Sequence, residues 1–131
     1  MKTETNKLII IRGVPGSSKS TKAREIMSND PSFVHFEADM YFMDGDEYKF
    51  DPKKLFHAHN WCQKSAFTAM ENGKNVIVSN TFVFKDHMKP YIDKAKALGY
   101  DIEVMVMRGN YKSVHNVPDE VVERMRKQFE E

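Results

Sequence analysis

The sequence has little of what marks secreted, membrane-bound or strongly basic proteins. It contains one cysteine, Cys62, so no disulfide can form within the chain, which favours a reducing compartment and a cytoplasmic location. No apolar stretch approaches the ~20 residues that span a bilayer. The amino-terminal segment MKTETNK also lacks the apolar core of a signal peptide. Membrane attachment is therefore not expected.

An excess of charge of one sign is also missing. The 20 Lys and Arg residues nearly balance the 19 Asp and Glu residues, which gives a formal net charge of +1. The chain lacks the whole-protein basic field of many nucleic-acid binders, so any polynucleotide would have to be held by a local cluster of side chains. The length of 131 residues predicts one domain over 1–131, large enough to bury about two-thirds of its unfolded surface.

Glycine is scarce too, yet two of the six glycines, Gly13 and Gly16, fall within GVPGSSKS, directly after an apolar run. This segment matches the phosphate-binding pattern G-x-x-x-x-G-K-[ST] except that Ser18 stands where the second glycine is usual. Small residues in such a loop let backbone N–H groups turn toward a phosphate, and the following helix directs its positive end at the same anion. What Ser18 costs depends on whether its position needs a positive φ, which the sequence leaves open.

The other residues of this loop have expected roles toward a nucleoside triphosphate such as ATP. Lys19 would reach the β- and γ-phosphates, and the hydroxyl of Ser20 would ligate Mg²⁺. The strand–loop–helix context favours a phosphate loop over a generic Gly/Ser turn. The candidate nucleotide-binding residues are Gly13, Gly16, Ser17, Ser18, Lys19, Ser20 and Thr21.

Apolar runs alternate with amphipathic segments along the chain. The predicted strands, apolar without strict alternation, cover 7–12, 33–37, 75–79 and 102–107. The predicted helices cover 20–28, 51–72 and 86–98 and a last segment from Pro118. Between them, 41–50 is expected to be irregular, with a turn at Asp44-Gly45. Four strand–helix repeats predict an α/β fold: a small four-stranded parallel sheet with helices on both faces.

Asp39 comes directly after the second predicted strand. Ligands of such sheets bind at the carboxyl ends of the strands, so Asp39 and the phosphate loop are expected at the same edge. A carboxylate there can accept the proton of an attacking hydroxyl, the acid–base step that phosphoryl transfer needs. The alternative is a loop aspartate that caps a turn or lies in water.

Several segments, taken in order, resemble P-loop kinases. The loop GVPGSSKSTKARE, Asp39, the segment SNT and the tail VPDEVVERM resemble the 5′-kinase domain of bacteriophage-type polynucleotide kinases. The middle of the chain, 44–61, is similar to a related group of small P-loop kinase-like proteins, because it contains D-G-x-Y-x-F-D-P followed by A-H-x-W. The resemblance runs from Leu8 to Phe129.

This resemblance implies a P-loop NTPase fold and an ATP-dependent transfer of the γ-phosphoryl group to a 5′-hydroxyl end of RNA or DNA, with Mg²⁺ as cofactor. It assigns Lys19 and Ser20 to the phosphates and the metal, and Asp39 as the general base. The implied partner is the 5′ end of a single-stranded nucleic acid. A nucleoside or another small hydroxyl compound is the alternative acceptor.

The chain departs from the family pattern around the site. Met40 replaces a second acidic residue, and Asn80 stands where an aspartate usually precedes a threonine. Lys112 occupies the place of the arginine that the lid supplies to the phosphates, and it lacks the bidentate fork of arginine. Arg108 could supply that fork, or it could be a solvated arginine at the end of a strand.

These departures leave two classes of function open. One is an active kinase, and the other is a nucleotide-binding module that has lost catalysis and mediates interactions or regulation. The kinase is favoured because Lys19, Ser20 and Asp39 are retained together, and a catalytically dead protein would not need a base. The predicted catalytic residues are Asp39, Lys19, Arg108 and Lys112.

Overall fold

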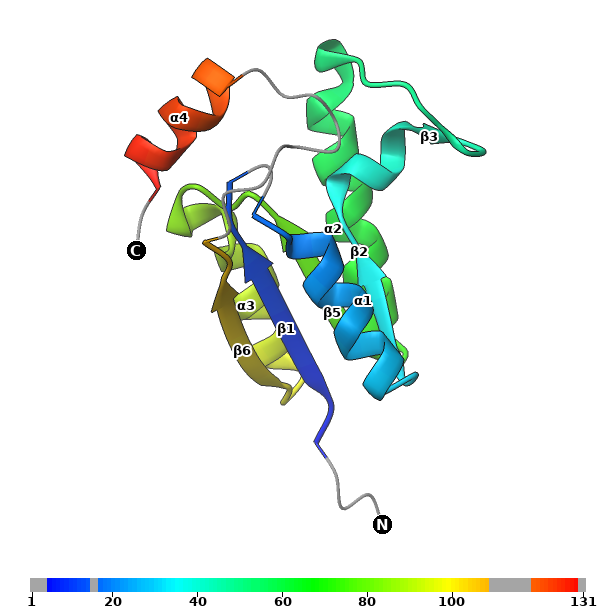
Figure 1. Cartoon of the computed structure of the whole chain (residues 1–131). Helices are drawn as coiled ribbons and strands as arrows, with labels where there is room; N and C mark the ends of the chain where they lie inside the picture. The colour runs from blue at the N-terminus through cyan, green and yellow to red at the C-terminus, as the bar shows by residue number, and fades with distance from the viewer. Residues whose placement is uncertain (1–4, 15–16, 109–118, 130–131) are drawn as a thin grey trace.

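A four-stranded parallel sheet forms the centre of the molecule (Figure 1). The computed structural model describes residues 5–14, 17–108 and 119–129. The strands lie in the order β2–β5–β1–β6. They are β1 (Lys7–Arg12), β2 (Phe33–Phe36), β5 (Asn75–Asn80) and β6 (Asp101–Val106). Arg12 pairs with both Asn80 and Val106, so the carboxyl ends of β1, β5 and β6 are level. The predicted fold class is confirmed.

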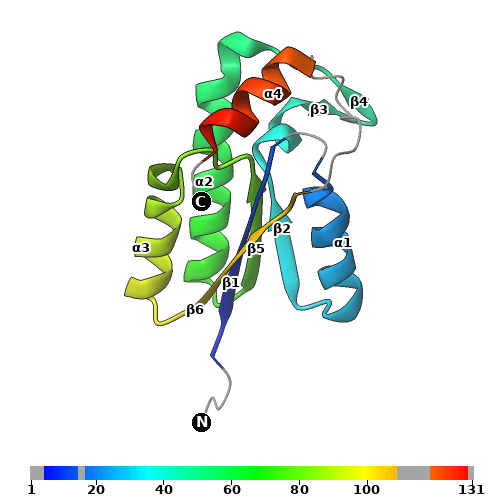
Figure 2. The ribbon, with the colours of Figure 1, turned by 60° about the vertical axis from the view of Figure 1, so that its left-hand side comes forward.

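Helices cover both faces of this sheet (Figure 2). α1 lies on one face, α2 and α3 lie on the other, and α4 lies near the carboxyl ends of the strands. No helix in the described part of the chain is long and apolar enough to cross a membrane. The helices are α1 (Lys19–Asn29), α2 (Leu55–Glu71), α3 (Lys89–Ala97) and α4 (Asp119–Gln128).

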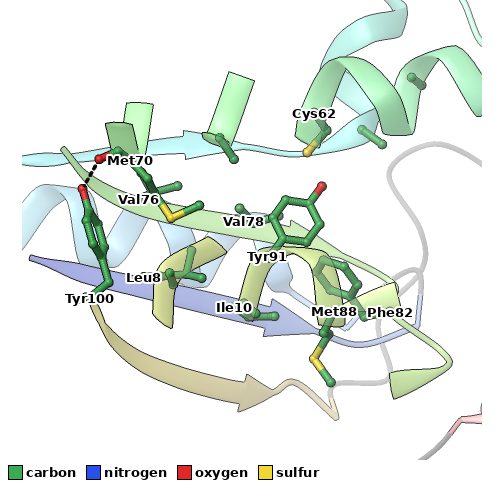
Figure 3. Packing of buried hydrophobic residues seen from close by; sticks show 14 of the residues in the cluster. Leu8, Ile10, Cys62, Met70, Val76, Val78, Phe82, Met88, Tyr91 and Tyr100 are labelled. Carbon is green, nitrogen blue, oxygen red and sulfur yellow. Dashed lines mark hydrogen bonds between the residues drawn. The ribbon is translucent and has the colours of Figure 1, made fainter. Parts of the chain in front are cut away.

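The apolar run of β1 supplies a core on each face because successive side chains of a strand point to opposite sides. Leu8 and Ile10 belong to the larger cluster under α2 and α3, whereas Ile9 and Ile11 pack with residues of α1. Figure 3 shows the larger cluster, in which the hydroxyl of Tyr100 donates to the carbonyl oxygen of Met70 at 2.8 Å. This hydrogen bond satisfies the one polar atom that the ring carries into the core.

Two helices begin later than predicted. The segment from Asp51 opens with a 3₁₀ turn, η2 (Pro52–Lys54), which Asp51 caps by accepting from the backbone N–H of Lys53 at 3.0 Å, and α2 follows. The predicted start at Asp86 was wrong, since that residue lies in a second 3₁₀ turn, η3 (Lys85–His87). α3 begins only at Lys89. Its second residue is Pro90, and a helix tolerates proline in its first turn because the backbone N–H groups there have no partner within the helix.

The stretch predicted as irregular, 41–50, has local structure of its own. A 3₁₀ turn, η1 (Ala38–Phe42), leads into a two-stranded hairpin made of β3 (Met43–Asp44) and β4 (Glu47–Tyr48). The predicted turn is confirmed, with Gly45 at φ +65°. In both views the hairpin lies toward the carboxyl ends of β1 and β2, on the same side of the sheet as α4.

Candidate active site

The phosphate loop leaves β1 at a residue that must be glycine. The backbone N–H of Gly13 donates to the carbonyl oxygen of Thr81 at 3.2 Å. A Cβ atom on Gly13 would clash with the hydroxyl of Ser17 and lie 2.6 Å from the carbonyl oxygen of Met107. The Ser17 hydroxyl is buried and has no hydrogen-bond partner within the described residues, so it retains its capacity to bond a phosphate oxygen. Gly16, also predicted to bind nucleotide, lies outside the described residues.

Ser18 adopts the backbone conformation that the missing glycine would favour. Its φ of 72° and ψ of 27° lie in the left-handed region, where a Cβ atom costs about 1–2 kcal/mol. Ser18 precedes α1, and its carbonyl oxygen accepts from the backbone N–H of Lys22 at 3.0 Å. The fold therefore requires a positive φ here. A strained residue that persists beside a candidate ligand site is consistent with a functional loop.

Lys19 is the first residue of α1 and is largely withdrawn from water. Its ammonium group donates to the carbonyl oxygen of Val14 at 3.2 Å. Burial lowers the pKa of Lys19 to about 8, and the carboxylates of Glu37 and Asp39 oppose this shift. The two predicted site residues, Lys19 and Asp39, are thus close enough to interact electrostatically, and a carboxylate that the sequence analysis missed acts on the same lysine.

That missed carboxylate, Glu37, connects α1 to the ends of β2 and β5. It accepts hydrogen bonds from the hydroxyl of Ser20 at 2.9 Å and from the hydroxyl of Ser79 at 3.0 Å. Since Ser79 gives its proton to Glu37, it accepts from Nε2 of His35, which lies 2.6 Å away. Burial lowers the pKa of His35, so the neutral ring supports this hydrogen-bonded chain.

A sequence signal for Glu37 did exist. Residues two apart on a strand face the same side, so His35 and Glu37 point together toward the α1 face. His35 pairs with Ile77 on β5, which places Glu37 opposite Ser79 if the register is continued. The register could not be known beforehand, so the contact with Ser20 could not be predicted.

Asp39 lies in η1 rather than directly at the end of β2, because the strand stops at Phe36. One carboxylate oxygen accepts from the phenol of Tyr48, at a distance of 2.9 Å. Burial raises the pKa of Tyr48, and the charge of Asp39 raises it further, so the phenol keeps its proton. The β3–β4 hairpin thus folds back and orients the predicted base.

Asn80, singled out as a departure, has a structural role at the end of β5. Its side-chain oxygen accepts from the backbone N–H of Ala38 at 2.8 Å, and its amide nitrogen donates to Sγ of Cys62 at 3.6 Å. An ionised aspartate could make only the first of these bonds, since it has no N–H to donate. Asn80 therefore fixes η1, and with it Asp39, against β5 and α2.

Arg12, at the carboxyl end of β1, is a second residue near the site that was not predicted from the sequence. It is 2% exposed, and its Nε and Nη2 atoms donate to the carbonyl oxygen of Phe82 at 3.1 and 2.7 Å. Phe82 has a φ of 44°, a strained value for an aromatic residue. The guanidinium carbon of Arg12 lies 4.2 Å from the ring centroid of Phe129, just after α4. Arg12 thus joins the end of β1, the loop after β5 and the last described turn of the chain.

The remaining predicted residues occupy different surroundings. Arg108 is exposed just beyond β6, at the carboxyl edge of the sheet. Thr21 is exposed on α1, where its hydroxyl accepts from Arg24 at 3.4 Å, so it lies at the margin of the loop. Lys112, the predicted lid cation, lies outside the described residues.

Comparisons with known proteins decide the family. A model of the AAA domain family matches residues 8–131 of this chain. The chain belongs to this family of P-loop proteins. Its resemblance to P-loop kinases, predicted from the sequence, is confirmed. NEDD4-binding protein 2 of Homo sapiens is 38% identical over 96 residues, which make up 72% of this chain but only 5% of the human protein. The chain thus spans a small part of that relative.

Solved structures share the fold. A chain of the Pnkp1/Rnl/Hen1 RNA repair complex superposes with a TM-score of 0.72 at 21% identity, covering 98% of this chain and 45% of that one. A gluconokinase from Sinorhizobium meliloti 1021 gives a TM-score of 0.66 at 12% identity, with 98% and 77% covered. The APS kinase CysC of Mycobacterium tuberculosis gives 0.57 at 16% identity, with 97% and 99% covered. The chain therefore shares the P-loop kinase-like fold of these structures.

Proposed function

We propose that this chain transfers the γ-phosphoryl group of ATP to the 5′-hydroxyl end of a nucleic acid. The observation that carries the proposal is the presence of two carboxylates with separate partners beside Lys19. Glu37 bonds the hydroxyl of Ser20, whereas Asp39 is held by Tyr48. One carboxylate would then serve a metal and the other a hydroxyl acceptor.

The donor nucleotide would bind to the loop between β1 and α1. Backbone N–H groups at the start of α1 have no partner within the helix, and the helix dipole favours an anion there. The buried hydroxyl of Ser17 adds a donor, and Lys19 adds a positive charge. A phosphate would give the ammonium group of Lys19 a stronger acceptor than the carbonyl oxygen of Val14 that it now bonds.

The residues present fit Mg²⁺. This ion prefers oxygen ligands and is usually held by one or two carboxylates together with substrate phosphates. The Ser20 hydroxyl and the Glu37 carboxylate, 2.9 Å apart, would supply two such oxygen ligands. The described residues contain no group of three His, Cys, Asp or Glu that could hold a metal. We expect such an ion to be shared with the phosphates of the nucleotide. Once bound, Mg²⁺ would neutralise charge on the transferring phosphoryl group.

The transfer step would use Asp39 as the general base. The oxygen of the acceptor hydroxyl forms a bond to the γ-phosphorus while the bond from that phosphorus to the β–γ bridging oxygen breaks, and ADP leaves. The acceptor proton passes to the carboxylate of Asp39. Lys19 stabilises the charge on the phosphoryl oxygens, and Arg108 and Lys112 are the proposed further cations.

The proposal is tested by an acceptor panel. The protein is incubated with γ-labelled ATP and Mg²⁺ together with a 5′-hydroxyl RNA strand, a 5′-hydroxyl DNA strand, a nucleoside or gluconate. Preferred labelling of a strand, abolished by Lys19→Ala, is the expected result. Labelling of a small compound alone would replace the proposal with a small-molecule kinase, the alternative that the gluconokinase-like fold favours. ATP binding without transfer would indicate a nucleotide-binding module.

A cytoplasmic location and a single domain over 1–131 complete the proposal. The lone cysteine is a buried free thiol, which suits a reducing compartment. Within the described residues one parallel sheet, with its two core clusters, joins the segments from β1 to β6.

A further inference from the structure

Exposed apolar side chains are concentrated in 41–56, the stretch that follows Asp39 in the chain. Eight large hydrophobic residues are exposed in the described part of the chain, and five of them fall within 41–56. These residues come from η1, the hairpin, the segment just after it and the start of α2; the hairpin and the start of α2 lie at the carboxyl-end side of the sheet (Figures 1 and 2). Their exposed fractions are Tyr41 38%, Met43 45%, Phe50 49%, Leu55 42% and Phe56 73%. Such a concentration of apolar surface marks an interaction site.

The rings of this surface are connected to the predicted base. Tyr48, whose hydroxyl bonds Asp39, stacks on Phe50 with an interplanar angle of 10° and a centroid distance of 6.3 Å. Phe42, only 4% exposed, supports Phe50 from within the core, with centroids 5.1 Å apart. Phe42 also contacts Tyr41 at 5.6 Å. Phe50 and Tyr41 are therefore held in place on a buried ring, close to the carboxylate that would receive the acceptor proton.

Two exposed lysines near these rings could contact backbone phosphates. Lys53 and Lys54 are exposed in η2, after Asp51 and Pro52, and neither ammonium group forms an ion pair among the described residues. Part of the acidic charge of the hairpin is offset by Lys49, which pairs with Asp44 at 2.9 Å and with Glu47 at 3.7 Å. The stretch thus combines exposed rings with two exposed lysines that are free of ion pairs among the described residues.

We infer that Phe50 and Tyr41 stack the first bases of a single-stranded acceptor whose 5′-hydroxyl lies at Asp39. The inference rests on the proposed kinase function and names the part of the acceptor that is recognised. Aromatic side chains stack on any base through its π-face, and nearby lysines track the backbone phosphates. Because every base has such a face, the surface selects for a base at the 5′ end without selecting its sequence.

The test compares two 5′-hydroxyl strands that differ only in the first nucleotide, which carries a base in one and is abasic in the other. Binding is followed by the anisotropy of a 3′-terminal dye, and transfer is followed with γ-labelled ATP. The wild-type protein should prefer the base-bearing strand by about 5–150-fold, the range that one stacked base supplies. Phe50→Ala and Tyr41→Ala should each reduce this ratio at least several-fold. Each ratio compares the two strands with the same protein sample. A smaller folded fraction therefore affects both measurements equally and leaves the ratio unchanged.

Leu98→Ala is the matched control, because Leu98 is 41% exposed at the end of α3 and precedes the start of β6. It should keep the wild-type ratio. A wild-type ratio near one with efficient transfer would overturn the stacking surface and leave the kinase standing. A large ratio in binding without transfer would support the surface and contradict the kinase. Failure to bind either strand would contradict both, and the surface would then suit a protein partner.

Discussion

The two sides of the candidate site are built in opposite ways. The phosphate side, between β1 and α1, depends on backbone and small buried residues: Gly13 has no room for a Cβ atom, and Ser18 is forced into the left-handed region. The proposed acceptor side, 41–56, depends on large side chains that remain exposed. A backbone cradle fits any triphosphate, whereas side chains can change without altering the fold. One scaffold could therefore keep the same phosphoryl donor and vary the acceptor through changes of exposed side chains.

Lys19 lies where the two sides meet. Its pKa is affected by Glu37, which belongs with the phosphate side through Ser20, and by Asp39, which belongs with the acceptor side through Tyr48. Substitutions on each side should therefore have separable effects on ATP affinity and on the transfer rate.

The largest effect is expected for Asp39→Asn, which breaks the acceptor side alone. The amide cannot accept a proton, so the transfer rate should fall by about 10²–10⁴-fold. ATP affinity should stay unchanged, as measured by calorimetry. Asp93→Asn, an exposed carboxylate on α3, is the control. Weaker ATP binding without a separate effect on the rate would make Asp39 a nucleotide or metal ligand instead.

Arg108→Ala should slow transfer by about 10²-fold, the lower end for loss of one group that stabilises transition-state charge. Lys112→Ala should have a smaller effect, because only arginine offers a planar fork. Arg108→Lys keeps the charge and should recover only part of the rate. Arg124→Ala, exposed on α4, should match the wild type, and folding stability should change little in each variant. If Arg108→Ala also matches the wild type, Lys112 becomes the candidate cation; if neither substitution slows transfer, the nucleotide-binding module is favoured.

Lys19→Ala breaks the phosphate side. It removes a charge-assisted hydrogen bond worth about 1.5–3 kcal/mol, so ATP affinity should fall by about 10–150-fold. Calorimetric titration of ATP in Mg²⁺ measures this. Lys22→Ala, on the same helix and paired with Glu25, should bind ATP normally. Absence of ATP binding by the wild-type protein would refute the phosphate loop itself.

Glu37→Gln tests the phosphate side more finely, because it should weaken only the Mg²⁺-dependent part of ATP binding. The loss should be about tenfold in Mg²⁺, since glutamine keeps an oxygen but not the charge. Little change is expected in the presence of a chelator. Glu25→Gln, an exposed carboxylate on α1, is the control. Equal losses with and without Mg²⁺ would make Glu37 a structural partner of Ser20.

The smallest effect is on stability. Ser18→Gly should stabilise the protein by about 0.5–1 kcal/mol, because relief of the left-handed strain exceeds the entropy that glycine loses on folding. Ser28→Gly, in the exposed last turn of α1, should destabilise it by a similar amount. Urea denaturation of both variants measures the difference. A destabilising Ser18→Gly would mean that the serine side chain contributes more than its backbone costs.

The contrast between the two sides also explains what could be predicted from the sequence. The strands and the phosphate loop follow from local patterns, such as the apolar run of 8–11 and the spacing of Gly13, Lys19 and Ser20. The contact of Glu37 with Ser20 depends on strand register and the position of α1, and the bond from Tyr48 to Asp39 depends on a hairpin that folds back. Such contacts join segments that no local pattern relates.

The most direct test of the account is the position of the transferred phosphoryl group. Wild-type protein is incubated with γ-labelled ATP, Mg²⁺ and a 5′-hydroxyl strand, and the strand is then digested to mononucleotides. The account predicts that the label is recovered only as the 5′-phosphate of the first nucleotide, because the rings of 41–56 place that end at Asp39. Label on any other nucleotide, or in inorganic phosphate alone, would contradict it.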